Sequence, residues 1–314
     1  MCTSSLIPLL SLEEAQLPTS LALGSFDGLH AGHKSVIKEI TKKNIRDKNG
    51  IPTVVSFWPH PREVLYKETR LRLDLPSEKI DLLQPLGIKQ LVLIPFDKNL
   101  SALSPDKFVK TIPLEKLKAC RIAVGENFRF GKDRSGDALC LKKLAEASNV
   151  EVCIVPILKD QSGRMSSSRI RDALSIGDLI NAEKLMGRPY KFQGKVVKGK
   201  GIGTKIGWPT ANLEVDGRKF LPGIGVYAAY AWIETNCSPF PAVMNLGPQP
   251  TINPKSPSAV EVHIINKEIN LKECQLTIQP IKRLRGQKRF KNLQELSKQI
   301  ALDKEKALSE LRNT

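Results

Sequence analysis

The chain has 314 residues, 41% of them hydrophobic, a size and composition that favour two folded domains and exclude a disordered chain. Its apolar runs are far shorter than the roughly 20 residues of a membrane-spanning helix, and its first twenty residues hold no Lys or Arg, unlike a signal or transit peptide. We therefore expect a soluble, cytoplasmic protein without a membrane partner. The net charge of +17 indicates polyanionic ligands, such as nucleotides or nucleic acids, without choosing among them.

The first half of the chain alternates strand and helix patterns. Strands are predicted at 21–26, 53–57, 90–95, 121–124 and 150–157. Helices are predicted between them, at 31–46, 79–86, 108–117 and 137–147. This alternation implies an α/β domain in which a parallel sheet is covered by helices on both faces.

The pattern changes after residue 186, where Gly187-Arg188-Pro189 ends the last helix of the first half. Short strands without intervening helices follow, at 191–198, 226–233, 242–246, 260–266 and 275–281. They predict an antiparallel β-barrel, and a charged amphipathic helix closes the chain. We place the domain boundary between residues 186 and 187, so that 1–186 and 187–314 form the two domains.

The first predicted strand runs into Gly24-Ser-Phe-Asp-Gly-Leu-His-Ala-Gly-His33, and a helix follows. Three glycines let this backbone turn tightly and approach a ligand closely: Gly24, Gly28 and Gly32. The helix start offers N–H groups and a partial positive charge to an anion, and His30 and His33 can donate hydrogen bonds to one phosphate. This arrangement suits nucleotidyl transfer, which needs stabilised negative charge; two histidines that merely cap the helix are the alternative.

The string resembles the HxGH signature of the nucleotidyltransferase superfamily, and its longer form resembles bacterial FAD synthetases. Three further segments are similar to that family in the same order: Phe57-Trp-Pro-His-Pro-Arg62, Val124-Gly-Glu-Asn-Phe-Arg-Phe-Gly131 and Ser166-Ser-Ser-Arg-Ile-Arg171. In the last segment Ser168 stands in the usual place of Thr and keeps its hydroxyl. The resemblance implies a Rossmann-like FMN adenylyltransferase domain.

The same resemblance implies the residues of the first site. His30, His33 and Arg171 would act in catalysis. ATP and FMN would be bound by Gly24, Phe26, Asp27, Gly28, Gly32, His60, Pro61, Asn127, Arg129, Ser166, Ser167 and Ser168.

A second glycine-rich string lies in the barrel region, Val197-Lys-Gly-Lys-Gly-Ile-Gly-Thr-Lys-Ile-Gly-Trp-Pro-Thr-Ala-Asn-Leu213. Its glycines, which can wrap phosphates with backbone N–H groups, are Gly199, Gly201 and Gly203. The string is no Walker A loop, because the GK[ST] ending is absent. After Pro209 in the sequence, Thr210 and Asn212 are two residues apart, so that on an extended segment their side chains lie on one side. Their oxygens suit Mg²⁺ bound to a nucleotide. An ordinary hairpin loop is the alternative.

This string resembles the G-[FY]-PTAN segment of riboflavin kinases, and four shorter segments match that family in order: 221–227, 245–251, Glu261-Val-His-Ile264 and 282–290. The resemblance implies that Glu261 is the general base for the 5′-hydroxyl of riboflavin and that Arg285 lies near the flavin; His263 would support the strand. The chain departs from the family at Thr204-Lys205, Asn266 and 269–272, where the family usually has Arg, Asp and a D-L-Y-G turn.

Residues 21–307 are thus identified as similar to bifunctional riboflavin kinases/FAD synthetases, which implies riboflavin, FMN and ATP as substrates and Mg²⁺ as cofactor. An adenylyltransferase whose barrel only binds flavin is one alternative. A nucleic-acid-binding protein is another, disfavoured by 5% aromatic content and no recognition motif. The six cysteines lack CxxC spacing and are expected to be reduced thiols. The sequence leaves homo-oligomerisation open.

Overall fold

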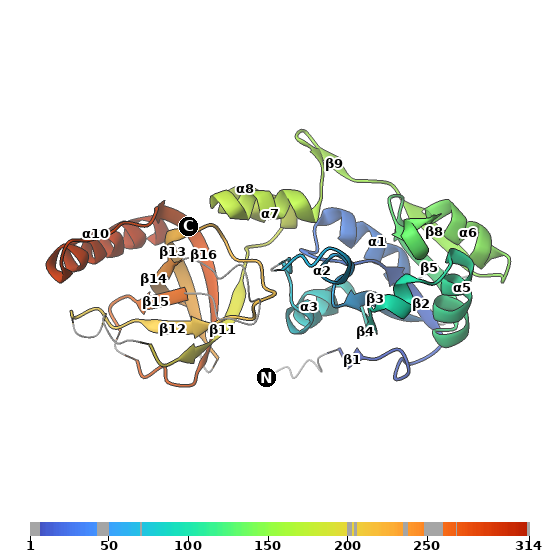
Figure 1. Ribbon diagram of the computed structural model, residues 1–314, viewed down its shortest axis with the longest axis horizontal. Helices are drawn as coiled ribbons and strands as arrows, with labels where there is room; N and C mark the ends of the chain where they lie inside the picture. The colour runs from blue at the N-terminus through green and yellow to red at the C-terminus, as the bar shows by residue number, and fades with distance from the viewer. Residues whose placement is uncertain are drawn as a thin grey trace. The chain divides into compact units, whose positions relative to one another are not determined.

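The computed structural model describes residues 7–42, 50–69, 71–199, 203, 206–234, 238–247, 260–267 and 269–312. The chain divides into two compact units (Figure 1). The first unit comprises residues up to 68 together with 74–166, and the second comprises 69–73 together with the residues from 167 onwards.

A six-stranded parallel sheet forms the centre of the first unit, which confirms the predicted fold class. Its strands, in spatial order, are β1 (Leu9–Leu10), β4 (Gln90–Pro95), β3 (Ile51–Trp58), β2 (Thr19–Leu23), β5 (Ala119–Gly125) and β8 (Glu151–Val155). From β2 the chain proceeds to β3 and β4 on one side, and then to β5 and β8 on the other. In such sheets ligands bind beyond the carboxyl ends of the strands where the order reverses, here between β2 and β5.

Helices cover both faces of this sheet, as predicted. On one face, α1 (Ala31–Thr41) buries Val36, Ile37 and Ile40 in a cluster that includes α3 (Pro76–Leu83) and η1 (Gln84–Leu86). On the other face lie α5 (Pro105–Val109), η2 (Lys110–Lys116) and α6 (Ala138–Glu146). The predicted helix at 108–117 contains Pro113, which has no N–H to donate, and η2 is accordingly a wider π-helical segment.

Shorter elements complete the first unit. They are α2 (Pro61–Leu65), α4 (Lys98–Ser101), η3 (Lys132–Arg134) and the two-residue strands β6 (Arg129–Phe130), β7 (Gly136–Asp137), β9 (Lys159–Asp160) and β10 (Gly163–Arg164). β6 pairs with β7, and β9 with β10, in antiparallel hairpins.

The second unit contains the predicted antiparallel barrel, closed by six strands. In spatial order these are β11 (Phe192–Val197), β12 (Ala211–Glu214), β15 (Val260–Ile264), β14 (Phe240–Leu246), β13 (Gly225–Ile233) and β16 (Gln275–Arg285). The helices α7 (Ser167–Ile176) and α8 (Leu179–Met186) belong to the same unit. β12, which sequence analysis treated only as an extended segment after a loop, completes the barrel.

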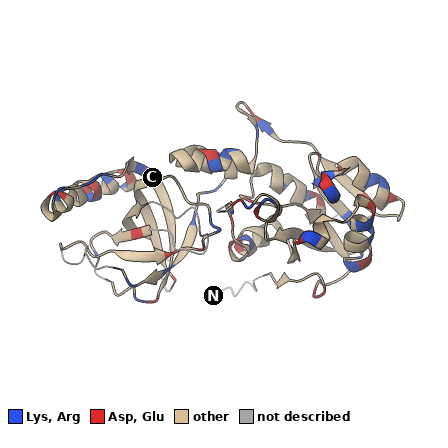
Figure 2. Cartoon of the chain, in the orientation of Figure 1, with Lys and Arg blue, Asp and Glu red and all other residues tan. Residues whose placement is uncertain are grey.

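The C-terminal helix α10 (Leu293–Arg312) packs on the barrel through Ala307 and Leu311, which lie in one buried cluster with Val226, Val243 and Leu284. Its sequence holds four acidic and four basic residues, and Figure 2 shows both kinds interspersed along it. The helix therefore presents a mixed surface and no uniform basic stripe of the kind that nucleic-acid-binding helices carry.

Residues 69–73 lie among the residues of the second unit. Arg72 forms an isolated parallel bridge with Lys219, and the buried Lys219 ammonium donates to the Leu73 carbonyl at 2.6 Å. Arg171 of α7 donates through Nε to the Leu71 carbonyl at 2.7 Å.

Gly223 seats α7 beside the barrel: its N–H donates to the Leu174 carbonyl at 2.9 Å, and a Cβ there would lie 2.1 Å from the Ser175 carbonyl oxygen. We expect Gly223→Ala to lower the free energy of unfolding of the second unit by about 1–3 kcal/mol, because the backbone must shift. Gly286→Ala is the control, since its nearest contact would be at 3.9 Å. Urea unfolding measures both, and equal stabilities of the two variants would contradict this packing.

Candidate active sites

The first candidate site lies at the carboxyl end of β2, in the loop that leads into α1. Three residues of this loop have positive φ: Phe26 at 44°, Gly28 at 81° and Leu29 at 39°. Residues with side chains adopt such angles only where the surroundings enforce them. The Phe26 and Leu29 side chains are buried, and so anchor the loop in this conformation.

The segment that leads into α3 holds the loop by hydrogen bonds. The Asp74 carboxylate accepts from the Gly28 N–H at 2.9 Å, and the Asp74 N–H donates to Oδ1 of Asp27 at 3.2 Å. The buried Lys79 ammonium donates to the Ser25 carbonyl at 2.7 Å. Asp27, a predicted ligand-binding residue, is fully buried and fixes the loop from inside.

His30 and His33 meet at the start of α1. His30 caps the helix, because its Nδ1 accepts from the His33 N–H at 3.4 Å. The two rings stack with centroids 3.7 Å apart, and the Phe26 ring meets His33 edge-on at 5.4 Å. A Cβ at Gly32 would lie 3.2 Å from the His30 ring, so glycine is needed for this close approach. In neutral His30 the proton then sits on Nε2, which donates away from the helix.

Burial lowers the pKa of His30 to about 4, with Arg164 adding to the shift and Asp27 opposing it. Burial also lowers the pKa of His33 well below its usual range, and His30, Lys79 and Arg164 add to that shift. Both imidazoles are therefore neutral at pH 7. The Nδ1 atom of His33 is buried and has no hydrogen-bond partner in the described part of the chain.

Sequence analysis missed Arg164, Asp74 and Lys79. Arg164 ends the β9–β10 hairpin and acts electrostatically on both histidines. Only the positive charge of Arg164 within a glycine-containing turn could have drawn attention to it. Asp74 and Lys79 lie outside every motif, and the tertiary fold brings them to the loop.

The other residues predicted for the first site occupy several elements. His60 caps α2, with Nδ1 accepting from the Arg62 N–H at 3.1 Å, and Pro61 begins that helix. Asn127 follows β5, so it lies at the same sheet edge as the β2 loop. Arg129 is exposed on β6. Ser166 belongs to the first unit, whereas Ser167, Ser168 and Arg171 belong to α7 of the second.

A cavity of about 660 Å³ in the first unit brings Pro61 and Arg129 together. Five phenylalanines contribute to its wall, among them residues of β3, of α5 and of the segment around β6: Phe57, Phe96, Phe108, Phe128 and Phe130. Arg62, Lys132 and Arg134 add positive charge. The cavity thus offers aromatic faces beside cations, a combination that suits an aromatic ligand bearing a phosphate.

The second candidate site is a cavity of about 790 Å³ in the second unit. Its wall includes six of the predicted residues, Gly199, Gly203, Thr210, Asn212, Glu261 and Arg285. Strand register explains part of this gathering: Asn212 of β12 lies opposite Glu261 of β15, and Glu261 lies opposite Asn245 of β14. Gly201, Thr204 and Lys205 lie outside the described residues.

The glycine string lies directly against the two oxygen-bearing side chains. A Cβ at Gly199 would lie 1.9 Å from Nδ2 of Asn212, and one at Gly203 would lie 3.0 Å from Oγ1 of Thr210. The Pro209 carbonyl contacts Nδ1 of His263 at 2.8 Å, and the Trp208 ring meets His263 edge-on. His263, which also lines the cavity, therefore fixes the segment of residues 208 and 209.

A second barrel cavity, of about 780 Å³, shares Lys198, Gly199, Thr210 and Asn212 with the first. Its far wall includes Lys267 and the residues 269–272, where the sequence departs from the family pattern. Asn266, another departure, has a φ of 56°, a conformation that Asn and Asp both tolerate. Thr210 and Asn212 thus form the wall between two spaces.

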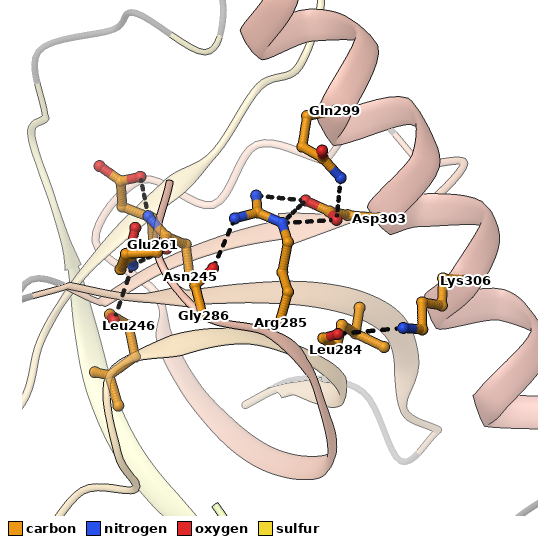
Figure 3. A network of polar contacts seen from close by, with 10 residues as sticks. Asn245, Leu246, Glu261, Leu284, Arg285, Gly286, Gln299, Asp303 and Lys306 are labelled. Carbon is orange, nitrogen blue, oxygen red and sulfur yellow. Dashed lines mark hydrogen bonds and ion pairs between the residues drawn. The ribbon is translucent and has the colours of Figure 1, made fainter. Parts of the chain in front are cut away.

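Figure 3 shows the polar network of the first barrel cavity. Nε of Arg285 donates to both carboxylate oxygens of the buried Asp303 at 2.9 and 3.0 Å, and Nη2 donates to Oδ2 at 2.7 Å. Gln299 donates to the same carboxylate. The sequence gives no signal for Asp303 and Gln299, because they look like ordinary polar residues of an amphipathic helix. Arg285 is thereby held in place by α10.

Comparisons with known proteins agree with the two-unit division. The FAD synthetase family matches residues 12–169, and the riboflavin kinase family matches residues 186–311. A bifunctional riboflavin kinase/FMN adenylyltransferase of Buchnera aphidicola subsp. Schizaphis graminum is 34% identical over 301 residues, 93% of this chain and 94% of that protein. Proteins of the same name from Escherichia coli K12 and Bacillus subtilis 168 are each 32% identical, over 90% and 95% of this chain and 90% and 94% of their own lengths.

Among solved structures, one of a macrolide-efflux protein from Streptococcus pneumoniae matches with a TM-score of 0.81 at 27% identity, covering 95% of this chain and 97% of that one. That name refers to transport. In the described ranges of this chain, however, no helix has the length and hydropathy to cross a membrane. The match therefore supports a shared fold, and we do not transfer the efflux function in that protein's name to this chain.

The depressed pKa of His30 generates a stability prediction. Between pH 6.5 and about 4 the unfolded chain binds a proton at His30 while the folded chain does not, so the first unit loses stability as the pH falls through this window. We expect His30→Asn, which can still cap α1, to give a shallower fall of the melting temperature between pH 6.5 and 5. Calorimetry measures it, and slopes identical to those of the unmodified protein would contradict the buried neutral imidazole.

Proposed function

The chain belongs to the family of bifunctional riboflavin kinases/FMN adenylyltransferases, and from this membership we propose which residues carry each of its two reactions. It phosphorylates riboflavin to FMN with one ATP, and it adenylylates FMN with a second ATP to give FAD and pyrophosphate. The observation that carries the assignment is that the first unit holds the histidine loop at the start of α1 and an aromatic cavity, whereas the second unit holds the glycine string and Glu261 in the wall of a separate cavity.

In the kinase reaction, the 5′-hydroxyl oxygen of riboflavin attacks the γ-phosphorus of ATP, the bond from that phosphorus to the β-bridging oxygen breaks, and ADP leaves. Glu261 takes the hydroxyl proton. Of the two barrel cavities, Glu261 lines only the one beside α10, so riboflavin occupies that cavity. ATP occupies the other, and its γ-phosphate reaches the attacking hydroxyl at the shared wall of Thr210 and Asn212.

Mg²⁺ fits the residues of this shared wall. Thr210 and Asn212 supply neutral oxygens, the kind of ligand that Mg²⁺ takes together with phosphates, and the backbone of Gly199 and Gly203 lies directly against these two side chains. No group of three His, Cys, Asp or Glu residues suited to a metal ion occurs within the described ranges. Mg²⁺ would therefore arrive bound to ATP, where it neutralises the charge of the phosphates.

In the adenylylation reaction, a phosphate oxygen of FMN attacks the α-phosphorus of the second ATP, and pyrophosphate leaves. The start of α1, the neutral His30 and His33 and the cationic Arg164 stabilise the negative charge that develops on the phosphates. The flavin ring stacks in the aromatic cavity that Phe57, Phe96 and Phe128 line. Arg129 and Asn127 bind FMN, and Ser166 binds the phosphates of ATP.

We further propose that the functional boundary falls at 186/187, between the end of α8 and the first barrel strand. The four described cysteines, Cys120, Cys140, Cys153 and Cys274, are free thiols. Free thiols and ATP as substrate support a reducing compartment, the cytoplasm.

Glu261→Ala and His33→Ala separate the two reactions. Glu261→Ala is expected to reduce FMN formation from riboflavin by at least about 10²-fold, while FAD formation from supplied FMN is retained. His33→Ala is expected to give the reverse pattern, with FAD formation lowered by about 10²-fold or more. Chromatography of flavin products measures both. If either variant is folded and loses both reactions, two separate sites are excluded.

Arg164→Gln tests the cation that contributes to the lowered pKa of both histidines. We expect it to lower the rate of FAD formation by about 10- to 100-fold, because one positive charge beside the transferring phosphates is lost. Lys159→Gln is the matched control. Lys159 lies opposite Arg164 in the same hairpin, and its substitution removes an equal charge. An equal effect of both substitutions would mean that Arg164 acts only through the general field of the hairpin.

A further inference from the structure

A chain of hydrogen bonds leads from the loop after β16 to the carboxylate of Glu261. Nε2 of Gln287 donates to Oδ1 of Asn245 at 2.7 Å and also to the Leu246 carbonyl at 3.1 Å. Nδ2 of Asn245 donates to Oε2 of Glu261 at 3.3 Å. Figure 3 shows the part of this chain between Asn245 and Glu261.

The direction of these bonds is fixed at both ends. A carboxylate only accepts hydrogen bonds, so Asn245 must turn its NH₂ group toward Glu261 and its oxygen toward Gln287. Gln287 must then donate through its NH₂ group to the Asn245 oxygen. The Leu246 carbonyl can also only accept, so it requires the same orientation of the Gln287 amide. Among the described residues, Asn245 is the one that donates a hydrogen bond to Glu261. Oε2 is thereby occupied, and Oε1 remains for the hydroxyl of the substrate.

The same loop also bounds the flavin cavity. Gln287, Lys288 and Phe290 line it. At the start of the loop, Nη1 of Arg285 donates to the Gly286 carbonyl at 2.9 Å while Asp303 holds the rest of the guanidinium. The loop is therefore tied to α10 at residue 285 and to β14 at residue 287.

We propose that Asn245 and Gln287 are positioning residues for phosphoryl transfer: they orient the Glu261 carboxylate, and they make this orientation depend on the closed position of the loop 286–290 over the flavin. The proposal rests on the assignment of Glu261 as the general base. Charged groups that line the same cavity are Lys198, His263, Arg285, Lys288 and Asp303. None of them is recorded as hydrogen-bonded to Glu261, so orientation comes from the uncharged amide.

Asn245→Asp keeps the shape of the side chain and removes the donated N–H, so that two carboxylates face each other. We expect kcat for FMN formation to fall by about 100-fold. The apolar Asn245→Leu removes the bond without repulsion, and we expect a loss of about 10-fold. A residue that serves packing alone would give the opposite order, because Asp fits the site better than Leu.

Gln287→Glu acts through Asn245 without altering it. The carboxylate introduced at position 287 can only accept hydrogen bonds. To donate to that carboxylate, Asn245 must turn its NH₂ group away from Glu261. We expect kcat for FMN formation to fall about 10-fold or more, whereas Gln287→Met, which imposes no such turn, has a smaller effect. Gln275→Glu is the matched control on β16: it bonds Gln193 and lies outside the cavity wall, and we expect kcat to remain unchanged.

Two further readouts exclude other causes. The dissociation constant of riboflavin, from its fluorescence with a non-hydrolysable ATP analogue, and the KM for ATP are expected to change less than 3-fold. FAD formation from supplied FMN in the same chain is expected to stay unchanged, and so reports folding. The proposal would be overturned if the variants changed only KM, or if Asn245→Asp and Gln287→Glu kept kcat within 2-fold of the value of the unmodified protein. Retained FMN formation in Glu261→Ala would instead overturn the assignment of the base on which it rests.

Discussion

The kinase site depends on the register of three neighbouring barrel strands. Antiparallel pairing sets Asn212, Glu261 and Asn245 opposite one another on β12, β15 and β14. Because side chains alternate between the two faces of a strand, a slip of one residue would turn the carboxylate away from the cavity. The buried side chains of Val260, Val262 and Leu246 resist such a slip. In the proposed kinase reaction, neutral oxygens and glycine backbone around the Glu261 carboxylate then serve to bind phosphate, Mg²⁺ and the substrate hydroxyl.

In the proposed adenylylation site, the first unit binds phosphate in another way. Its two histidines are neutral because they are buried, so in the proposal they act as hydrogen-bond donors, while Arg164 and the start of α1 supply positive charge. The strained loop that carries the histidines is held from inside by Asp27, Asp74 and Lys79. Two unrelated solutions to phosphate binding in one chain explain why its motifs fall into two separate groups.

Hydrophobic periodicity predicted the parallel sheet and the barrel, and the resemblance of contiguous motifs to riboflavin kinases implied that the glycine string and Glu261 share one site. Neither gave any hint of Asp303 or Gln299, which look like any other polar residue of α10 yet fix Arg285 through tertiary contact. Asp74, Lys79 and Arg164 were missed for the same reason. The four-residue strand β12 escaped prediction since Pro209 and the glycines before it indicate a loop.

The central claim is that one chain transfers two different parts of ATP at two separate sites. The most direct measurement follows isotopes in complete reactions that contain riboflavin, Mg²⁺ and ATP labelled with ³²P at either the α or the γ position. The account requires FMN to carry only the γ label, FAD to carry both labels, and pyrophosphate to carry the γ label. An α label in FMN, or FAD without the γ label, would contradict it.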